Sequence, residues 1–226
     1  MSSWSYSRLS TFEECPARYK YQNIDRISTP QHPAATRGTK IHDIAERYIN
    51  GVIEDDDCPS VLLDFEEAFF DLREGHKAGT VVVEEDWAFD KDWAPAGWVA
   101  DNTWGRYKLD ACVKNGNMLT VIDFKTGRYA GNEKTHEAQC ALYAVAASHK
   151  FPEAKFIKAE LWYLDHNRIS RYEYTQGQIT ERKIEFTERA LKLTTATEFP
   201  ATPSENSCRW CYFGKEGICK EAYGAQ

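Results

Sequence analysis

Two aspartates and a lysine lie close to one predicted turn in the middle of the chain. Asp110 lies on one predicted strand, Asp123 and Lys125 end the next, and the hairpin signal Asn115-Gly116 separates them. Side chains alternate along a strand, so Asp123 and Lys125 share a face and Phe124 points away. A carboxylate pair can hold a hard divalent cation, and a nearby lysine can orient a nucleophile or neutralise negative charge. Alone, the same residues would more often form a solvent-facing ion pair at a strand end.

The surrounding sequence predicts the elements that position these residues. Val121 and Ile122 are apolar and β-branched, which predicts that residues 119–124 form a buried strand leading into the turn at Thr126-Gly127. Further strands are expected at 81–89, 98–104, 107–113, 156–165 and 170–174, the last two forming a hairpin that turns at His166-Asn167. Helices are expected around 41–49, closed by Gly51, and at 60–76, 134–148 and 178–195, with two short helices divided by Pro16 at the start. The prediction is an α/β fold, a central mixed β-sheet flanked by helices.

Four segments match one family in order along residues 5–143. They are Ser5-Tyr-Ser-Arg-Leu9-Ser-Thr-Phe12-Glu-Glu-Cys15-Pro16-Ala-Arg-Tyr19, then Gly38-Thr-Lys-Ile-His42, then Asp110 with Asp123-Phe-Lys125-Thr-Gly127, and finally Gln139-Cys-Ala-Leu-Tyr143. Together they resemble the RecB-type branch of the PD-(D/E)xK nuclease superfamily. The resemblance implies a restriction-endonuclease-like core and phosphodiester hydrolysis.

The resemblance also implies a role for each matching residue. Mg²⁺ or Mn²⁺ would be held by His42, Asp110, Asp123 and the carbonyl of Phe124, with Lys125 orienting the attacking water. Gln139 and Tyr143, four apart on a helix, would contact the scissile phosphate or the catalytic carboxylates. Outside this pattern, His42 would be an ordinary packed histidine, and Gln139 with Tyr143 a polar surface pair. Glu84 or Glu85, on the first strand, could also reach the site.

The second chemical signal is a group of cysteines near the end of the sequence. Cys208 and Cys211 are separated by two residues, a spacing that lets two sulfurs bind one metal, and Cys219 adds a third thiol. The resemblance to AddB-type nucleases and CRISPR-adaptation exonucleases offers Cys15 as the fourth ligand of a [4Fe–4S] cluster. The seven residues between Cys211 and Cys219 exceed the usual family spacing. Structural Zn²⁺ or unliganded thiols are the alternatives, and the other three cysteines are expected to be ordinary thiols.

Composition points to a single intracellular domain. The 226 residues predict one nuclease domain, residues 1–226, with N-terminal helices at 1–36, a nuclease core at 37–197 and a cysteine-containing tail at 198–226. The net charge of −7 argues against a general basic DNA coat, although cations can be confined to one channel. Seven cysteines without a signal peptide indicate a reducing compartment, and no apolar run approaches membrane-span length. We therefore expect a cytoplasmic protein, bacterial or phage-encoded, with no membrane partner.

These observations predict a Mg²⁺- or Mn²⁺-dependent DNA exonuclease. Its substrate is expected to be single-stranded DNA or frayed ends in recombination, repair or replication. Tyr19 and Tyr21, beside Arg18 and Lys20, could supply the stacking and phosphate contacts that single strands require. A helicase, a recombinase or a single-strand-binding protein is a possible partner. The alternatives are a catalytically silent DNA-binding or assembly subunit of the same fold, and a zinc-ribbon interaction module.

Overall fold

A computed structural model describes residues 3–53 and 58–224 of the chain. The backbone separates into two compact units: one comprises residues 1–31 and 187–226, and the other comprises residues 32–186. The prediction of one domain, with an N-terminal segment at 1–36 and a tail at 198–226, is not tested by this division into units and remains a prediction. None of the described helices is long and apolar enough to cross a membrane.

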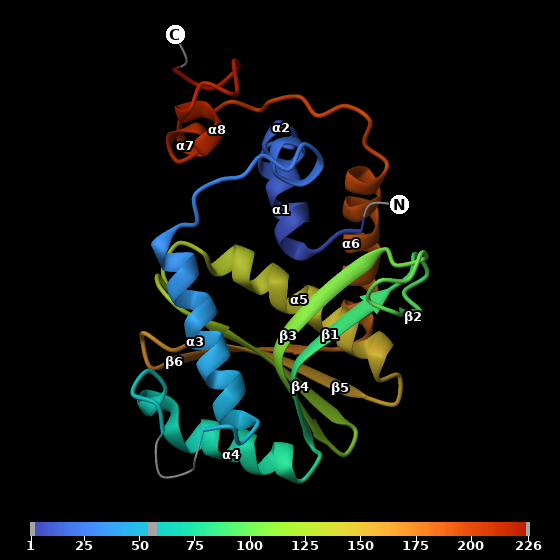
Figure 1. Ribbon diagram of the computed structural model, residues 1–226. Helices are drawn as coiled ribbons and strands as arrows, with labels where there is room; N and C mark the ends of the chain where they lie inside the picture. Colours follow the sequence, from blue (N-terminus) through green and yellow to red (C-terminus); the bar gives the residue numbers. More distant parts are fainter. Residues whose placement is uncertain (1–2, 54–57, 225–226) are drawn as a thin grey trace. The chain divides into compact units, whose positions relative to one another are not determined.

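A six-stranded mixed sheet forms the centre of the 32–186 unit (Figure 1). Its strands are β1 (Val81–Phe89), β2 (Pro95–Ala96), β3 (Gly105–Asn115), β4 (Met118–Lys125), β5 (Phe156–Tyr163) and β6 (Arg168–Tyr174). They lie in the order β2-β1-β3-β4-β5-β6, and only the neighbours β4 and β5 run parallel. The parallel pair requires a crossover, which is provided by helix α5 (Glu133–Lys150). The predicted α/β architecture is confirmed.

Helices α3 (Pro33–Ile49) and α4 (Glu66–Lys77) pack against one face of this sheet through an apolar cluster. Phe69 of α4 lies 5.1 Å from the ring of Phe124 and 5.6 Å from that of Trp162. Asp123 and Lys125, the neighbours of Phe124, point to the opposite face and contact α5. The predicted alternation at the end of β4 is therefore confirmed.

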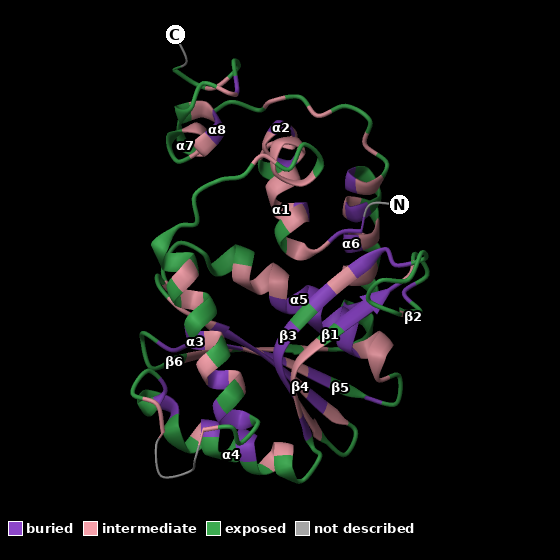
Figure 2. Ribbon diagram, in the orientation of Figure 1, coloured by how far each residue is buried: buried purple, intermediate pink, exposed green. Residues whose placement is uncertain are grey.

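Helix α5 is buried around its whole circumference from Cys140 to Ala147 (Figure 2). Alanine supplies four of these eight positions, and its small side chain lets the helix backbone approach its neighbours closely. A helix that is apolar on all sides belongs to the interior. Its polar residues lie at the two ends, with Gln139 in the N-terminal half and Ser148, His149 and Lys150 in the last turn.

The segment at 98–104 was expected to be a strand, and this prediction was wrong. Two tight turns occupy it, with the Ala100 amide donating to the Gly97 carbonyl and the Thr103 amide to that of Ala100. Trp98 is 36% and Val99 85% exposed, so the apolar residues at the start of this segment do not form a buried face, although Trp104 at its end is buried. The helix predicted at 60–76 begins later, because a 3₁₀ turn, Leu63–Phe65, precedes α4.

The unit of residues 1–31 and 187–226 is helical. It holds α1 (Tyr6–Glu14), α2 (Pro16–Tyr19), a π-helical turn (Lys20–Ile24), the end of α6 (Gln176–Thr194), α7 (Glu205–Arg209) and α8 (Tyr212–Lys215). Pro16 opens α2 at its first position, as predicted. The two chain segments are joined by a bidentate ion pair between Arg189 and Glu13, at 2.8 Å for both contacts. Phe199 also stacks on Tyr19, with ring centroids 6.0 Å apart.

Candidate active site and cysteine pocket

The β3–β4 hairpin brings Asp110 and Asp123 together at the end of its ladder. The last paired residues are Ala111 and Ile122, and just beyond them the Phe124 amide donates a 2.5 Å hydrogen bond to Asp110 Oδ2. Both aspartates are buried, at 7% and 6% exposure. Burial raises the pKa of Asp110 to about 6, against the opposing effect of its hydrogen bond to His42. A buried carboxylate pair is costly unless a cation balances it.

His42 and Glu84 complete a group of metal-ligand atoms around Asp110. His42 Nδ1, on α3, lies 2.9 Å from Oδ1 of Asp110 in the middle of β3. Glu84 stands opposite Asp110, since its neighbours Val83 and Glu85 pair with Ala111 and Leu109. One ligand atom from each of His42, Glu84 and Asp110 lies within 4.8 Å of the other two. Burial acts to lower the pKa of His42, but the hydrogen bond and charge of Asp110 outweigh it and raise that pKa.

Asp123, Lys125, Gln139 and Tyr143 form a second group of side chains in contact with one another. Lys125 Nζ lies 2.5 Å from Asp123 Oδ2 and donates to Gln139 Oε1 at 2.8 Å. Gln139 Nε2 donates in turn to Asp123 Oδ1 at 3.2 Å and to the Tyr143 hydroxyl at 2.8 Å. Burial raises the pKa of Tyr143 well above its ordinary value, so the hydroxyl stays neutral. Gln139 thus fixes the positions of both the carboxylate and the ammonium group.

One oxygen of this group accepts no hydrogen bond from the described residues. Asp123 Oδ2 is buried, and in the described part of the chain it accepts no hydrogen bond; the Lys125 ammonium beside it is an ion-pair neighbour. Buried carboxylate oxygens are normally satisfied by donors or by a metal. A carboxylate oxygen has more than one lone pair, so Asp123 Oδ2 can also serve as a ligand beside the Lys125 ammonium.

Asp165 fixes the turn that follows Lys125, and the sequence analysis did not identify it. Its carboxylate accepts two hydrogen bonds from Arg37 of α3, at 2.6 and 2.8 Å, and one from the Gly127 amide at 2.6 Å. A Cβ on Gly38 would come within 3.1 Å of Thr126 Oγ1, so a glycine there lets the helix approach the turn closely. Asp165 follows β5, the parallel neighbour of β4. The carboxyl ends of parallel strands meet at one edge, and that signal could have identified Asp165.

The structure thus gathers the predicted side chains into two adjoining groups. His42 and Asp110 join Glu84, and Asp123 joins Lys125, Gln139 and Tyr143; the hydrogen bond from the Phe124 amide to Asp110 links the groups. Glu85, the other acidic candidate on β1, contacts Trp87 Nε1 at 2.6 Å and Lys150 at 3.5 Å instead.

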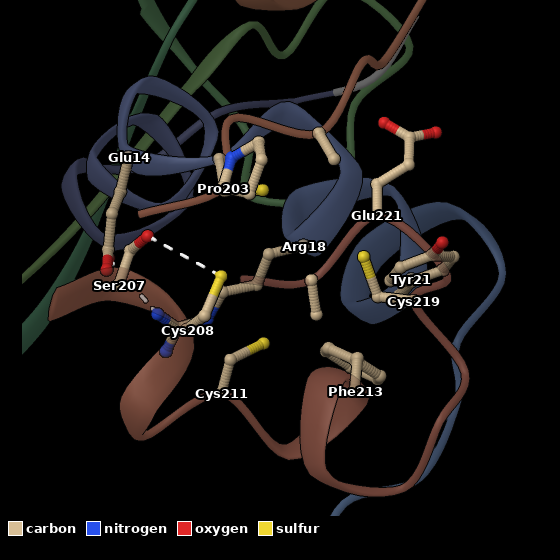
Figure 3. A pocket seen from close by; sticks show the side chains of 13 residues that line it. Glu14, Arg18, Tyr21, Pro203, Ser207, Cys208, Cys211, Phe213, Cys219 and Glu221 are labelled. Atoms are coloured by element: carbon tan, nitrogen blue, oxygen red, sulfur yellow. Dashed lines mark hydrogen bonds and ion pairs between the residues drawn. The ribbon is translucent and has the colours of Figure 1, made fainter. Parts of the chain in front are cut away.

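The four cysteines singled out from the sequence line one pocket of the helical unit (Figure 3). Cys15 comes from the α1–α2 junction, and Cys208, Cys211 and Cys219 come from the α7–α8 segment. All four thiols are free of disulfides. Apolar groups, including Phe213, Pro203 and Ala222, line the rest of the wall. A hydrogen bond from the Tyr223 backbone lowers the pKa of Cys208, which favours the thiolate form that binds metals.

Comparison with solved structures finds similar chains at low sequence identity. A protein of Eubacterium rectale, provisionally assigned as an exonuclease, aligns with a TM-score of 0.53 at 13% identity, over 95% of this chain and 87% of its own. At that identity the likeness shows the fold alone. The solved structure of SSO0001 aligns with a TM-score of 0.46 at 16% identity, over 99% of this chain and 88% of its own. No curated protein matches the sequence.

The family comparison confirms the resemblance found in the motifs. The profile of the PD-(D/E)XK nuclease superfamily matches residues 3–219, which include every segment described above. The chain therefore belongs to the PD-(D/E)XK nuclease superfamily.

Proposed function

We propose that this nuclease is a Mg²⁺- or Mn²⁺-dependent DNA exonuclease that acts on single-stranded or frayed ends. The observation that carries the proposal is the convergence of His42, Glu84 and Asp110, with ligand atoms within 4.8 Å, beside the Asp123–Lys125 pair. Superfamily membership supports phosphodiester hydrolysis, and the provisional assignment of the E. rectale protein supports the exonuclease mode.

The donor atoms suit a hard divalent cation. Carboxylate oxygens with one imidazole nitrogen favour Mg²⁺ and Mn²⁺. His42, Asp110 and Asp123 would hold the ion, and Glu84 adds a carboxylate that the motif does not include. Asp123 Oδ2, which accepts no hydrogen bond from the described residues, is available for that purpose. A bound ion would supply a water of lowered pKa and a positive charge for the scissile phosphate.

The protein's own groups then divide the remaining tasks. Lys125 forms an ion pair with Asp123 and donates one hydrogen bond to Gln139, and its ammonium group has three N–H donors, so a donor remains for the attacking water or a phosphate oxygen. Gln139 keeps Lys125 in that position and prevents it from rotating away. The Phe124 amide donates to Oδ2 of Asp110 and His42 contacts Oδ1, so both oxygens of the Asp110 carboxylate are held in one orientation. Such positioning in a water-poor site typically contributes about a hundredfold to a thousandfold in rate per group.

A cleavage assay on end-labelled DNA tests this proposal. Wild-type protein should degrade single strands in Mg²⁺ or Mn²⁺, and Asp123→Asn and Lys125→Met should each lower turnover by about a hundredfold to a thousandfold. Asp43→Asn is the matched control, because Asp43 is next to His42 but its side chain is 61% exposed. Near-normal cleavage by the Asp123→Asn protein would refute the site. DNA binding without any cleavage by wild-type protein would favour the silent-subunit alternative.

The cysteine pocket is proposed to hold a [4Fe–4S] cluster, with structural Zn²⁺ as the alternative. Four thiols from both segments of the helical unit line this pocket, and apolar neighbours would shield a cluster from solvent. Replacing Cys15, Cys208, Cys211 or Cys219 by Ser should lower metal content and melting temperature together. Cys58→Ser is the control, since Cys58 lies outside the pocket. Visible absorption that bleaches on oxidation identifies iron, and purified protein without iron or zinc would overturn the proposal.

A nuclease of this kind would act on ends that another protein exposes. We therefore include a helicase, a recombinase or a single-strand-binding protein as the proposed partner, in the cytoplasm of a bacterial host. Co-purification of the wild-type protein with such a partner from host cells, and its loss after DNase treatment, separates direct binding from tethering through DNA.

A further inference from the structure

A row of side chains crosses the sheet from the proposed catalytic lysine to its edge. Lys125 of β4 is in register with Tyr163 of β5, and Tyr163 is in register with Arg168 of β6. Residues in register project from the same face, here the face that α5 covers, where Tyr163 OH lies 2.8 Å from His136 Nδ1. Neighbouring strands are about 4.8 Å apart, so the backbones at Lys125 and Arg168 are separated by roughly 10 Å.

Arg168 is held in place by aromatic rings. Its guanidinium lies 4.0 Å from the centre of the Tyr129 ring, and the Tyr129 ring packs edge-on against Tyr163 at 4.8 Å. Tyr129 belongs to the turn that Asp165 fixes after Lys125. Stacking on a ring restricts the guanidinium plane but leaves its N–H groups free to donate in that plane.

No carboxylate pairs with Arg168 within residues 3–53 and 58–224. This separates it from neighbouring arginines, since Arg171 on the same strand contacts Glu160 at 3.0 Å and Arg37 is paired with Asp165. Arg168 is exposed, so its positive charge is available to a ligand. In a chain with a net charge of −7, a positioned and unneutralised guanidinium beside the site attracts an anion.

We propose that Arg168, stacked on Tyr129, binds a backbone phosphate of the substrate strand next to the phosphate that is cleaved at Lys125. The assignment rests on the proposed nuclease function and adds a substrate-binding residue outside the superfamily motifs. A guanidinium fork matches two phosphate oxygens. Base stacking on the same face of Tyr129 is disfavoured because Arg168 already covers it, so the contact is to phosphate rather than to a base.

Steady-state cleavage of a labelled single-stranded oligonucleotide in Mg²⁺, over a series of salt concentrations, tests the assignment. Arg168→Gln should raise KM roughly tenfold with kcat unchanged, since a charged hydrogen-bonded contact is lost from ground and transition states alike. The slope of log KM against log salt should fall by about 0.7, the value for one phosphate contact on a single strand. Arg168→Lys should keep the wild-type slope and show an intermediate KM, because it retains the charge and loses the fork.

Arg171→Gln is the matched control, on the same strand but paired with Glu160, and should leave KM and slope unchanged. An Arg168→Gln protein with wild-type KM and slope, or an equal loss in Arg171→Gln, would overturn the assignment. If wild-type protein does not cleave, the proposed function fails separately. In that case, fluorescence anisotropy measures how the affinity for the oligonucleotide depends on salt. The proposed role of Arg168 is rejected if Arg168→Gln has the same salt slope as wild type, or if wild-type protein does not bind the oligonucleotide.

Discussion

Glu84 stands in a backbone conformation that an L-residue adopts only at a cost. Its φ is +48°, whereas a residue in an antiparallel strand normally has φ near −140°. The left-handed region costs a non-glycine residue roughly 1–2 kcal/mol. This strain places a carboxylate directly opposite Asp110, where the proposed cation would bind. Strain of this kind persists where the surrounding structure enforces it, often at functional sites.

Comparing Glu84→Gly with Glu84→Ala isolates the strain. Both variants lose the carboxylate and its ion pair with Lys108, so these contributions cancel between them. Glycine removes the roughly 1–2 kcal/mol of backbone strain from the folded state. Its greater conformational freedom in the unfolded chain lowers the stability by about 0.4–1 kcal/mol. Glu84→Gly should therefore be more stable than Glu84→Ala by about 0.5–1 kcal/mol. For a protein of this size, that corresponds to a melting temperature ~1–4 °C higher.

Thermal unfolding followed by circular dichroism in EDTA measures this difference without metal. The same comparison at Glu85, whose φ is not positive, should have the opposite sign, because glycine in an ordinary strand position is roughly 0.5–1 kcal/mol less stable than alanine. Cleavage in Mg²⁺ should fall equally in Glu84→Gly and Glu84→Ala, since both lack the carboxylate. A Glu84→Ala protein that melts at or above the Glu84→Gly protein would refute the reasoning.

Three further predictions concern the core, the turn after β4 and the choice of metal. Phe69→Ala should lower the free energy of unfolding by roughly 3–5 kcal/mol, because the ring is fully buried against Phe124 and Trp162. Phe70 is 47% exposed, so Phe70→Ala should change that free energy by no more than about 0.5 kcal/mol. Urea denaturation measures both variants, and equal losses of stability would contradict the packing described. Arg37→Ala and Asp165→Ala should be coupled by roughly 0.5–1 kcal/mol in a double-mutant cycle of stability at pH 7, and additive losses would count against the bidentate pair. Because the Arg37 hydrogen bond lowers the pKa of Asp165, this coupling should be fully present above the ordinary carboxyl pKa and be lost as pH falls through the lowered value. After EDTA treatment, Mg²⁺ or Mn²⁺ should restore cleavage, and Ca²⁺ should compete with them without supporting hydrolysis; robust cleavage in Ca²⁺ alone would exclude the proposed coordination.

The sequence was most informative where local pattern and local structure coincide. The strand predicted at 81–89 matches β1, and the Asn115-Gly116 signal correctly predicted the β3–β4 turn, with Gly116 at φ +59°. The hairpin at His166-Asn167 was also correct, since Asn167 adopts φ +45° between β5 and β6. In each case the residue types within the strand or turn are sufficient to predict it, because its conformation does not depend on contacts with distant parts of the sequence.

Tertiary contacts decided the features that the sequence left open. Glu84 and Glu85 are identical in type and adjacent, and only the backbone at Glu84 turns its carboxylate toward Asp110. Asp165 acquires its role from Arg37, 128 positions away in sequence. The aromatic residues at 98–104 suggested a strand, but Trp98 and Val99 remain exposed, with Trp98 against Arg106 at 5.3 Å. Propensity cannot distinguish such an exposed turn from a buried strand.

The helical unit is assembled from two segments that lie on either side of the 155-residue stretch from His32 to Phe186. During synthesis, that stretch leaves the ribosome before residues 187–226, so the sheet can form while the helical unit still lacks more than half of its chain. The Arg189–Glu13 pair and the stacking of Phe199 on Tyr19 can form only afterwards. Until then, Cys15 remains a solitary thiol, and the pocket it shares with Cys208, Cys211 and Cys219 does not exist. The metal proposed for this pocket could therefore bind all four thiols only after residues 187–226 have been synthesised and folded.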